Sequence, residues 1–107
     1  MTRKLTKEER KNWLKYKIPG CSNLHRVKCN AIHLSVANSI EHEMAKCKMA
    51  YELMKDDHLI LTEAHEISTD LRRDLVDITF DEIYEFETDK KRSERHPKNI
   101  NVVMVEK

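Results

Sequence analysis

The apolar residues of this chain change their spacing once, near Asp56, and that change limits the folds open to the chain. From Ser35 to Lys55 they recur every three or four residues, as on one face of a helix. Beyond Asp56 they form short runs in which apolar and polar residues alternate, as in strands. The pattern therefore predicts one long helix packed on a small mixed sheet, an α+β architecture.

We expect the long helix to face the core with an apolar stripe. Ser35 or Ser39 can cap its first turn, and Asp56-Asp57 ends it. The stripe consists of Val36, Ile40, Met44, Cys47, Tyr51, Leu53 and Met54. Four strands are predicted to follow, at residues 58–62, 71–80, 83–88 and 101–105. The link at 79–82 is short enough for an antiparallel hairpin, and a charged segment at 89–98 precedes the last strand.

Residues 1–34 are predicted to form a basic N-terminal helical extension. A short helix is expected from Lys7 to Lys15, with Thr6 as its N-cap and Glu9 as the capping-box partner. Pro19-Gly20 then breaks the chain.

Composition excludes several classes of protein. A length of 107 residues predicts one domain with one modest core. A single glycine excludes glycine-rich phosphate loops. No run approaches the roughly 18 apolar residues that span a bilayer, so no membrane association is expected. The basic N-terminus lacks the apolar stretch of a signal peptide, so an intracellular protein with reduced cysteines is expected.

Charge is unevenly distributed behind the net value of +1. Residues 1–30 hold nine Lys/Arg and two acids, residues 31–90 hold six and fifteen, and residues 91–107 hold five and two. Basic flanks around an acidic middle are typical of nucleic-acid binders, although terminal Lys and Arg can also serve solubility alone.

Three carboxylates in the predicted sheet form a candidate metal site. Glu85 and Glu87 are two residues apart on one strand and so share a face, and Asp74 lies on the neighbouring strand of the hairpin. Converging carboxylates repel one another unless a cation lies between them, and oxygen ligands favour Mg²⁺ or Mn²⁺. Alternating acids on an amphipathic strand can equally well face water.

The order of these motifs resembles the PD-(D/E)XK nucleases. Arg73-Asp74-Leu75-Val76 followed by Ile83-Tyr84-Glu85-Phe86-Glu87 is similar to the aspartate and hhExK signature of that superfamily. Glu41-His42-Glu43-Met44-Ala45-Lys46 is similar to the His-xxx-Lys helix of competence-protein CoiA-like nucleases. Archaeal Holliday-junction resolvases belong to the same superfamily. The resemblance implies a restriction-endonuclease-like core at residues 35–107, with the usual second helix abbreviated or absent.

The resemblance also implies roles for individual residues. Asp74 and Glu85 would be the principal metal ligands, with Glu43 as a further ligand. Glu87 stands where the signature lysine is expected, and would be a ligand or orient the water. Lys46 would supply the missing lysine from the helix, with Lys90 in reserve. His42 shares a helix face with Lys46, although an ordinary exposed histidine is an equal alternative.

DNA is the expected partner, and a homodimer is expected to cut two strands. Basic residues flank the acidic site and can hold phosphates, unless they only form a solvated loop. They are Arg72, Arg73, Lys90, Lys91 and Arg92. The predicted function is metal-dependent hydrolysis of DNA phosphodiester bonds. The alternative is a non-catalytic nucleic-acid-binding or partner-binding protein on the same fold.

A second pattern, Cys21, His25, Cys29 and His33, contains side chains that bind zinc. On one continuous helix the first and last would lie about 18 Å apart. One tetrahedral ion cannot join them there, so structural zinc is not favoured.

Overall fold

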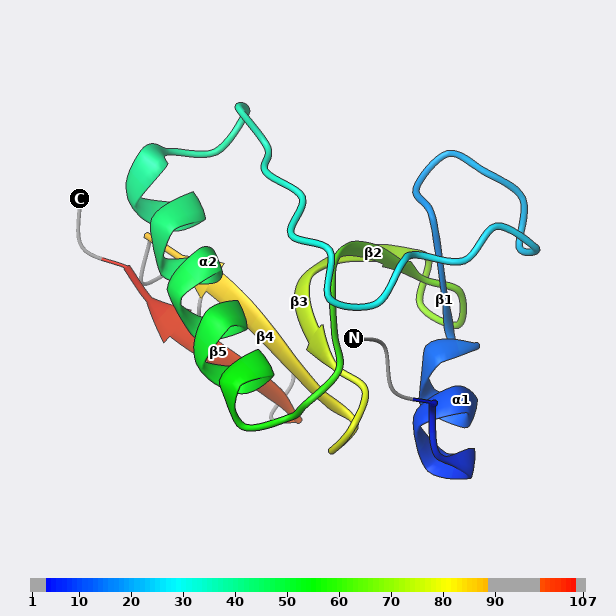
Figure 1. Cartoon of the computed structure of the whole chain (residues 1–107). Helices are drawn as coiled ribbons and strands as arrows, with labels where there is room; N and C mark the ends of the chain where they lie inside the picture. Colours follow the sequence, from blue (N-terminus) through cyan, green and yellow to red (C-terminus); the bar gives the residue numbers. More distant parts are fainter. Residues whose placement is uncertain (1–3, 89–98, 106–107) are drawn as a thin grey trace.

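A computed structural model of the chain describes residues 4–88 and 99–105. It contains two helices, α1 (Lys7–Trp13) and α2 (Ile40–Lys55). The strands are β1 (Tyr16–Lys17), β2 (Ile60–Glu66), β3 (Leu71–Asp77), β4 (Glu82–Glu87) and β5 (Ile100–Met104). They form one sheet in the order β1-β2-β3-β4-β5. Figure 1 shows α2 along one face of this sheet and α1 beside its β1 end.

The sheet is mixed, as the spacing of the apolar residues predicts. Three neighbouring strand pairs are antiparallel, and β4 and β5 are parallel. The predicted hairpin is confirmed, because Asp77 pairs with Glu82 across the turn that joins β3 to β4. The two-residue strand β1 was not predicted from the sequence; Tyr16 pairs with Glu66. The architecture is therefore α+β, with a five-stranded mixed sheet.

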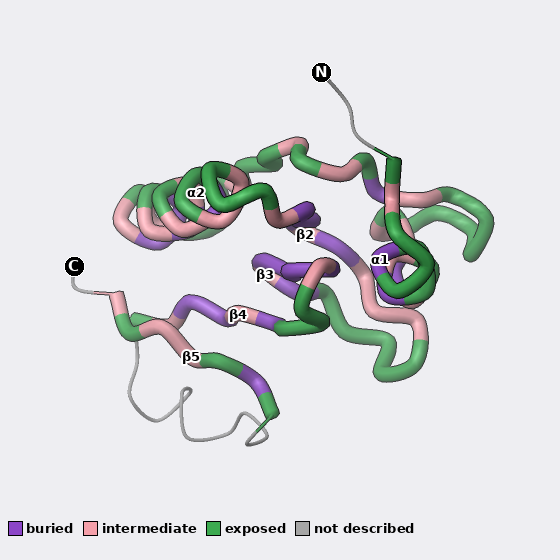
Figure 2. The backbone as a smooth tube through the Cα atoms, turned by 60° about the horizontal axis from the view of Figure 1, so that its bottom comes forward, coloured by how far each residue is buried: buried purple, intermediate pink, exposed green. Residues whose placement is uncertain are grey.

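Alternate residues of the strands pack into two separate apolar clusters, one on each face of the sheet. On one face, Ile60, Leu75 and Phe86 pack with Ala50 of α2. On the other face, buried strand residues pack with Tyr16 and others from the N-terminal segment. The members from the strands and their flanks include Leu61, Val76, Ile78 and Ile83, and those from the N-terminal segment include Leu5, Trp13 and Val27. Figure 2 shows the buried stretches concentrated in β2, β3 and β4, between α2 and the N-terminal segment.

The N-terminal extension is less helical than predicted. Its predicted capping box is present, since Thr6 and Glu9 each accept the backbone N–H of the other. Among residues 4–34, however, the helix ends at Trp13, because Tyr16 and Lys17 pair with β2 instead. Trp13 donates its indole N–H to the carbonyl of Val27 at 2.7 Å, which ties the following loop to α1.

The predicted apolar stripe on the long helix is wrong for four of its seven residues. The helix begins at Ile40, with Ser39 as its cap, so Val36 lies outside it and is fully exposed at 103%. Ile40, Met44 and Tyr51 are also exposed. The inward face of the first half of the helix carries His42, Glu43 and Lys46. These side chains find polar partners in the sheet, Asp74 for His42 and Glu63 for Lys46. Within residues 4–88 and 99–105, neither helix is long and apolar enough to cross a membrane.

Candidate functional site

Asp74 lies at a gap in the sheet. Of the seven residues of β3, only Asp74 has no pairing partner in either neighbouring strand. The β3–β4 pairing stops at Leu75, and the β2–β3 pairing skips from Leu75 to Arg73. The sheet therefore opens at Asp74, and backbone groups there need other partners.

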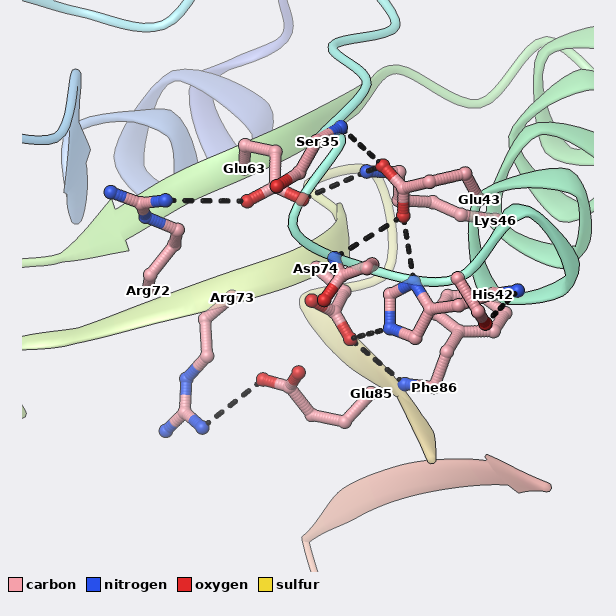
Figure 3. Close-up of polar contacts among 12 residues, drawn as sticks. Ser35, His42, Glu43, Lys46, Glu63, Arg72, Arg73, Asp74, Glu85 and Phe86 are labelled. Carbon is pink, nitrogen blue, oxygen red and sulfur yellow. Dashed lines mark hydrogen bonds and ion pairs between the residues drawn. The ribbon is translucent and has the colours of Figure 1, made fainter. Parts of the chain in front are cut away.

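The Asp74 carboxylate fills this gap. Its Oδ2 accepts the backbone N–H of Phe86 at 2.9 Å, in place of a strand-to-strand bond. The same oxygen lies 3.3 Å from Nε2 of His42, on α2. Figure 3 shows Asp74 between the histidine ring and β4, with Glu85 beside it. One carboxylate thus joins β3, β4 and α2.

Glu85 is a buried carboxylate next to Asp74, at 5% exposure, and does not face water. Burial, the charge of Asp74 and a hydrogen bond with it raise the pKa of Glu85 to about 8. Arg73 acts in the opposite direction, with its Nη1 at 3.3 Å from Oε1 of Glu85. Asp74 and Glu85 are therefore two acids held close together, of which one retains a proton near neutral pH.

The inner face of α2 carries a polar chain to Asp74. His42 Nδ1 lies 2.7 Å from Oε2 of Glu43, so the ring lies between two carboxylates. Lys46, with 0% exposure, donates to Glu43 Oε1 at 2.8 Å. Burial acts to raise the pKa of Glu43, but its hydrogen bonds, led by that from Lys46, lower it to about 2.

Glu63 belongs to this cluster although the sequence did not predict it. Strict alternation would place it with Leu61, in the cluster away from α2. Its backbone is left-handed, with a φ of 50°, which interrupts the pairing of β2 opposite Asp74. Its Oε1 instead accepts from Lys46 of α2 at 2.8 Å. The other non-glycine residues with positive φ are Asn30, Asp57, Asp70 and Asp81, types that tolerate this conformation. Local backbone strain thus positions Glu63.

Two arginines close the cluster on its outer side. Arg73 is buried and bonds Glu66 through Nε at 3.1 Å and Nη2 at 2.9 Å. Arg72 is more exposed, with Nη1 at 3.9 Å from Oε2 of Glu63. The sequence predicted both as phosphate contacts, but Arg73 is occupied by Glu66 and Glu85. Only Arg72 of the pair keeps an exposed side chain.

The structure brings five of the predicted site residues into one network: His42, Glu43, Lys46, Asp74 and Glu85. Glu87 lies at the end of β4 and is half-buried. Lys90, Lys91 and Arg92 lie outside the described residues. Asp77, three residues after Asp74 on β3, bonds His58 at 2.7 Å.

The donor chemistry of this cluster fits a hard divalent ion. Its carboxylates are those of Glu43, Glu63, Glu66, Asp74 and Glu85, and its permanent cations are Lys46, Arg72 and Arg73. Five against three leaves an excess of two negative charges when every acid is ionised. In the described part of the chain, no three His, Cys, Asp or Glu side chains form a metal cage by themselves. An ion would rest on Asp74 and Glu85, with water and phosphate as its other ligands, as Mg²⁺ often does.

The Cys/His pattern is dispersed in the structure. Cys21 and Cys29 are both free thiols, and the His25 ring bonds Ser22 at 3.1 Å. Burial, and after it the charge of Glu9, raise the pKa of the Cys29 thiol.

Comparisons of this chain with models of protein families, with curated proteins and with solved structures find no match.

Proposed function

We propose that this protein is a metal-dependent endonuclease that hydrolyses DNA phosphodiester bonds. One observation carries the proposal: Asp74 and Glu85 meet at a gap in the sheet, beside the buried polar face of α2. The resemblance of their sequence motifs to PD-(D/E)XK nucleases supports it, as does the excess of carboxylates over cations.

Each residue has a role in this proposal. Mg²⁺, when bound by Asp74 and Glu85, supplies an activated water and neutralises charge that develops on the phosphate. His42 holds Asp74 in place through its 3.3 Å contact. Lys46 is a positioning residue, because its ammonium is fully buried between Glu43 and Glu63. Glu43 holds His42 and Lys46 in place and is not a ligand of an ion at Asp74 and Glu85, because the His42 ring lies between it and Asp74. Glu87 orients the water.

The test is a cleavage assay with Mg²⁺ and with Mn²⁺ on linear duplex, single-stranded and four-way-junction DNA. Asp74→Ala and Glu85→Ala are expected to lower cleavage by a factor of about 10²–10³, the loss typical of removing one electrostatic catalytic group. Glu52→Ala, an exposed acid on α2, is the matched control and is expected to cleave like the wild type. Cleavage that survives in both site variants would contradict the assignment.

A non-catalytic protein that binds nucleic acid or a protein partner is the second candidate. It is favoured because two cations of the network are already paired: Lys46 and Arg73 each bond two carboxylates, and neither is free to hold a phosphate. The glutamate at position 87, in place of the signature lysine, also favours it. Retained DNA binding with no cleavage by any form would support this candidate over the nuclease.

A further inference from the structure

We infer that the pocket between the N-terminal loop and β2 binds an unpaired nucleotide of the substrate strand. The inference rests on the proposed function and deepens it, because it names the substrate class as nucleic acid with unpaired bases. Its evidence is the shape, lining and charge of a pocket that adjoins the carboxylate cluster.

The pocket has the size and lining of a small-molecule site. Its volume is about 570 Å³, within the range of roughly 300–1,000 Å³ usual for ligand pockets. Its apolar lining comes from Ile18, Pro19, Val27, Leu34 and Val36. Leu34 and Val36 are exposed at 65% and 103%, so part of the apolar lining faces solvent. A flat nucleobase, once out of its stack, is a ligand that aliphatic side chains can shield from water.

The charge of the pocket is opposite to that of the neighbouring cluster. Arg26, Lys28 and Arg72 line it, against the single carboxylate of Glu63. Cations around an apolar hollow suit a base joined to phosphates, since the cations hold the backbone while the hollow takes the base. An uncharged apolar ligand would gain nothing from these three cations.

The pocket and the carboxylate pair are connected through the protein. Arg72 and Glu63 line the pocket, and Glu63 bonds Lys46. From Lys46 the contacts continue through Glu43 and His42 to Asp74. Figure 3 shows this series running from Arg72 and Glu63 to Asp74 and Glu85. The wall of the pocket and the two acids therefore belong to one series of side-chain contacts.

The geometry favours unpaired over paired bases. In a duplex, each base is stacked and must be extruded before it can enter a pocket, at a cost of a few kcal/mol. Single strands, loops and branch points avoid that cost. The pocket therefore predicts a preference for single-stranded or branched DNA over linear duplex.

The experiment measures DNA binding by the full chain in the presence of a chelator, so that cleavage plays no part. The probes are a single-stranded oligonucleotide carrying one 2-aminopurine and the same sequence as duplex, at several salt concentrations. We expect the single strand to bind at least about tenfold tighter, because only the duplex has to extrude a base at a cost of a few kcal/mol. We also expect the 2-aminopurine fluorescence to change on binding.

Two pocket variants separate the base contact from the phosphate contact. Leu34→Asp is expected to remove the preference for single strands and the fluorescence change. Lys28→Glu is expected to reduce the dependence of log Kd on log salt by about one unit. Lys48→Glu, an exposed lysine on α2, is the matched control and should do neither.

Equal binding of duplex and single strand, or pocket variants that behave like Lys48→Glu, would overturn the inference. So would the absence of DNA binding at low salt, which would point to a protein partner. A nuclease assay without cleavage leaves these binding measurements valid, so failure of the proposed function and failure of the pocket assignment are distinguishable.

Discussion

Asp77 and Asp74 lie three residues apart on β3, and each contacts a histidine: His58 at 2.7 Å and His42 at 3.3 Å. Asp77, 1% exposed, also accepts the backbone N–H groups of Thr79 and Phe80 at 3.0 and 3.2 Å. It is paired on both sides within the sheet, with Ile60 and Glu82. Asp74 has no such pairing, and faces a second acid.

The difference separates a carboxylate whose partners are all satisfied from one that is held beside a second acid. Asp77 is satisfied by His58 and by the turn that it stabilises, so it contributes to folding and has no capacity left for a ligand. Asp74 is held next to Glu85 at a cost in repulsion, and such unfavourable arrangements are concentrated at functional sites. The end of β3 from Leu71 to Asp74 is not paired with β4 (the unpaired end) and is held from α2 and β2. The end from Leu75 to Asp77 is paired on both sides and is held by its own turn and by His58.

The largest expected effect tests whether α2 holds the unpaired end. Lys46→Met would leave Glu43 and Glu63 buried without their shared cation, which typically costs about 3–5 kcal/mol in the free energy of unfolding. Urea denaturation of the metal-free protein measures it. Lys48→Met, on the exposed side of the same helix, should change stability by less than about 0.5 kcal/mol. Equal losses in the two variants would remove the distinction between the faces of α2.

The second prediction compares the two aspartates directly. Asp77→Ala leaves two turn N–H groups without their acceptor, and we expect a loss of about 1–3 kcal/mol in stability. Above pH 8, where both acids are ionised, Asp74→Ala removes one backbone bond and the His42 contact but also relieves the repulsion on Glu85, so its loss should be smaller. Thermal or urea unfolding measures both. If Asp74→Ala were the more destabilising of the two, the unpaired end would be structural rather than functional.

The third prediction concerns pH. Glu85 has a pKa of about 8 when folded, against an ordinary value of 4.5. Between these values the folded protein keeps a proton that the unfolded chain has lost, so stability falls as pH rises through this window. The slope is at most about 1.4 kcal/mol per pH unit. Unfolding of the chelator-treated protein at several pH values measures it.

Glu85→Gln is the control for the pH prediction, because an amide cannot ionise and should remove this slope. Glu43 does not contribute in the same window, since its lowered pKa of about 2 leaves it ionised in both states above pH 5 or so. A wild-type protein whose stability is flat over this range would show that Glu85 ionises normally.

The strand residues of the site were predictable, because a period of two places Asp74 and Glu85 on neighbouring strands of a hairpin. The strand β1 was not, since its two residues pair with β2 some fifty positions away, and no local pattern encodes that. Strand ends also shifted by up to four residues, as at β2, which was predicted at 58–62 and runs from Ile60 to Glu66.

His42 and Lys46 of the helix were predictable from a sequence motif and not from the spacing of the apolar residues. That spacing selected Ile40 and Met44, which the structure exposes. The buried row is His42, Lys46 and Ala50, at steps of four, and only its polar members matched the family motif. Glu63 had no signal, because a left-handed glutamate within a strand is an exception that neither composition nor spacing announces.

The smallest expected effect comes from one exposed ion pair at each end of β3. Arg72 lies 3.9 Å from Glu63 at the unpaired end, and Lys15 lies 3.0 Å from Asp81 beside the turn. Arg72, Lys15 and Asp81 have exposed side chains, and Glu63 keeps Lys46 as its closer partner. Arg72→Ala and Lys15→Ala should therefore each change stability by less than about 1 kcal/mol. Their effects on DNA binding should differ, because only Arg72 lines the pocket. Equal weakening of single-strand binding by both variants would mean that general positive charge, rather than the unpaired end of β3, attracts the DNA.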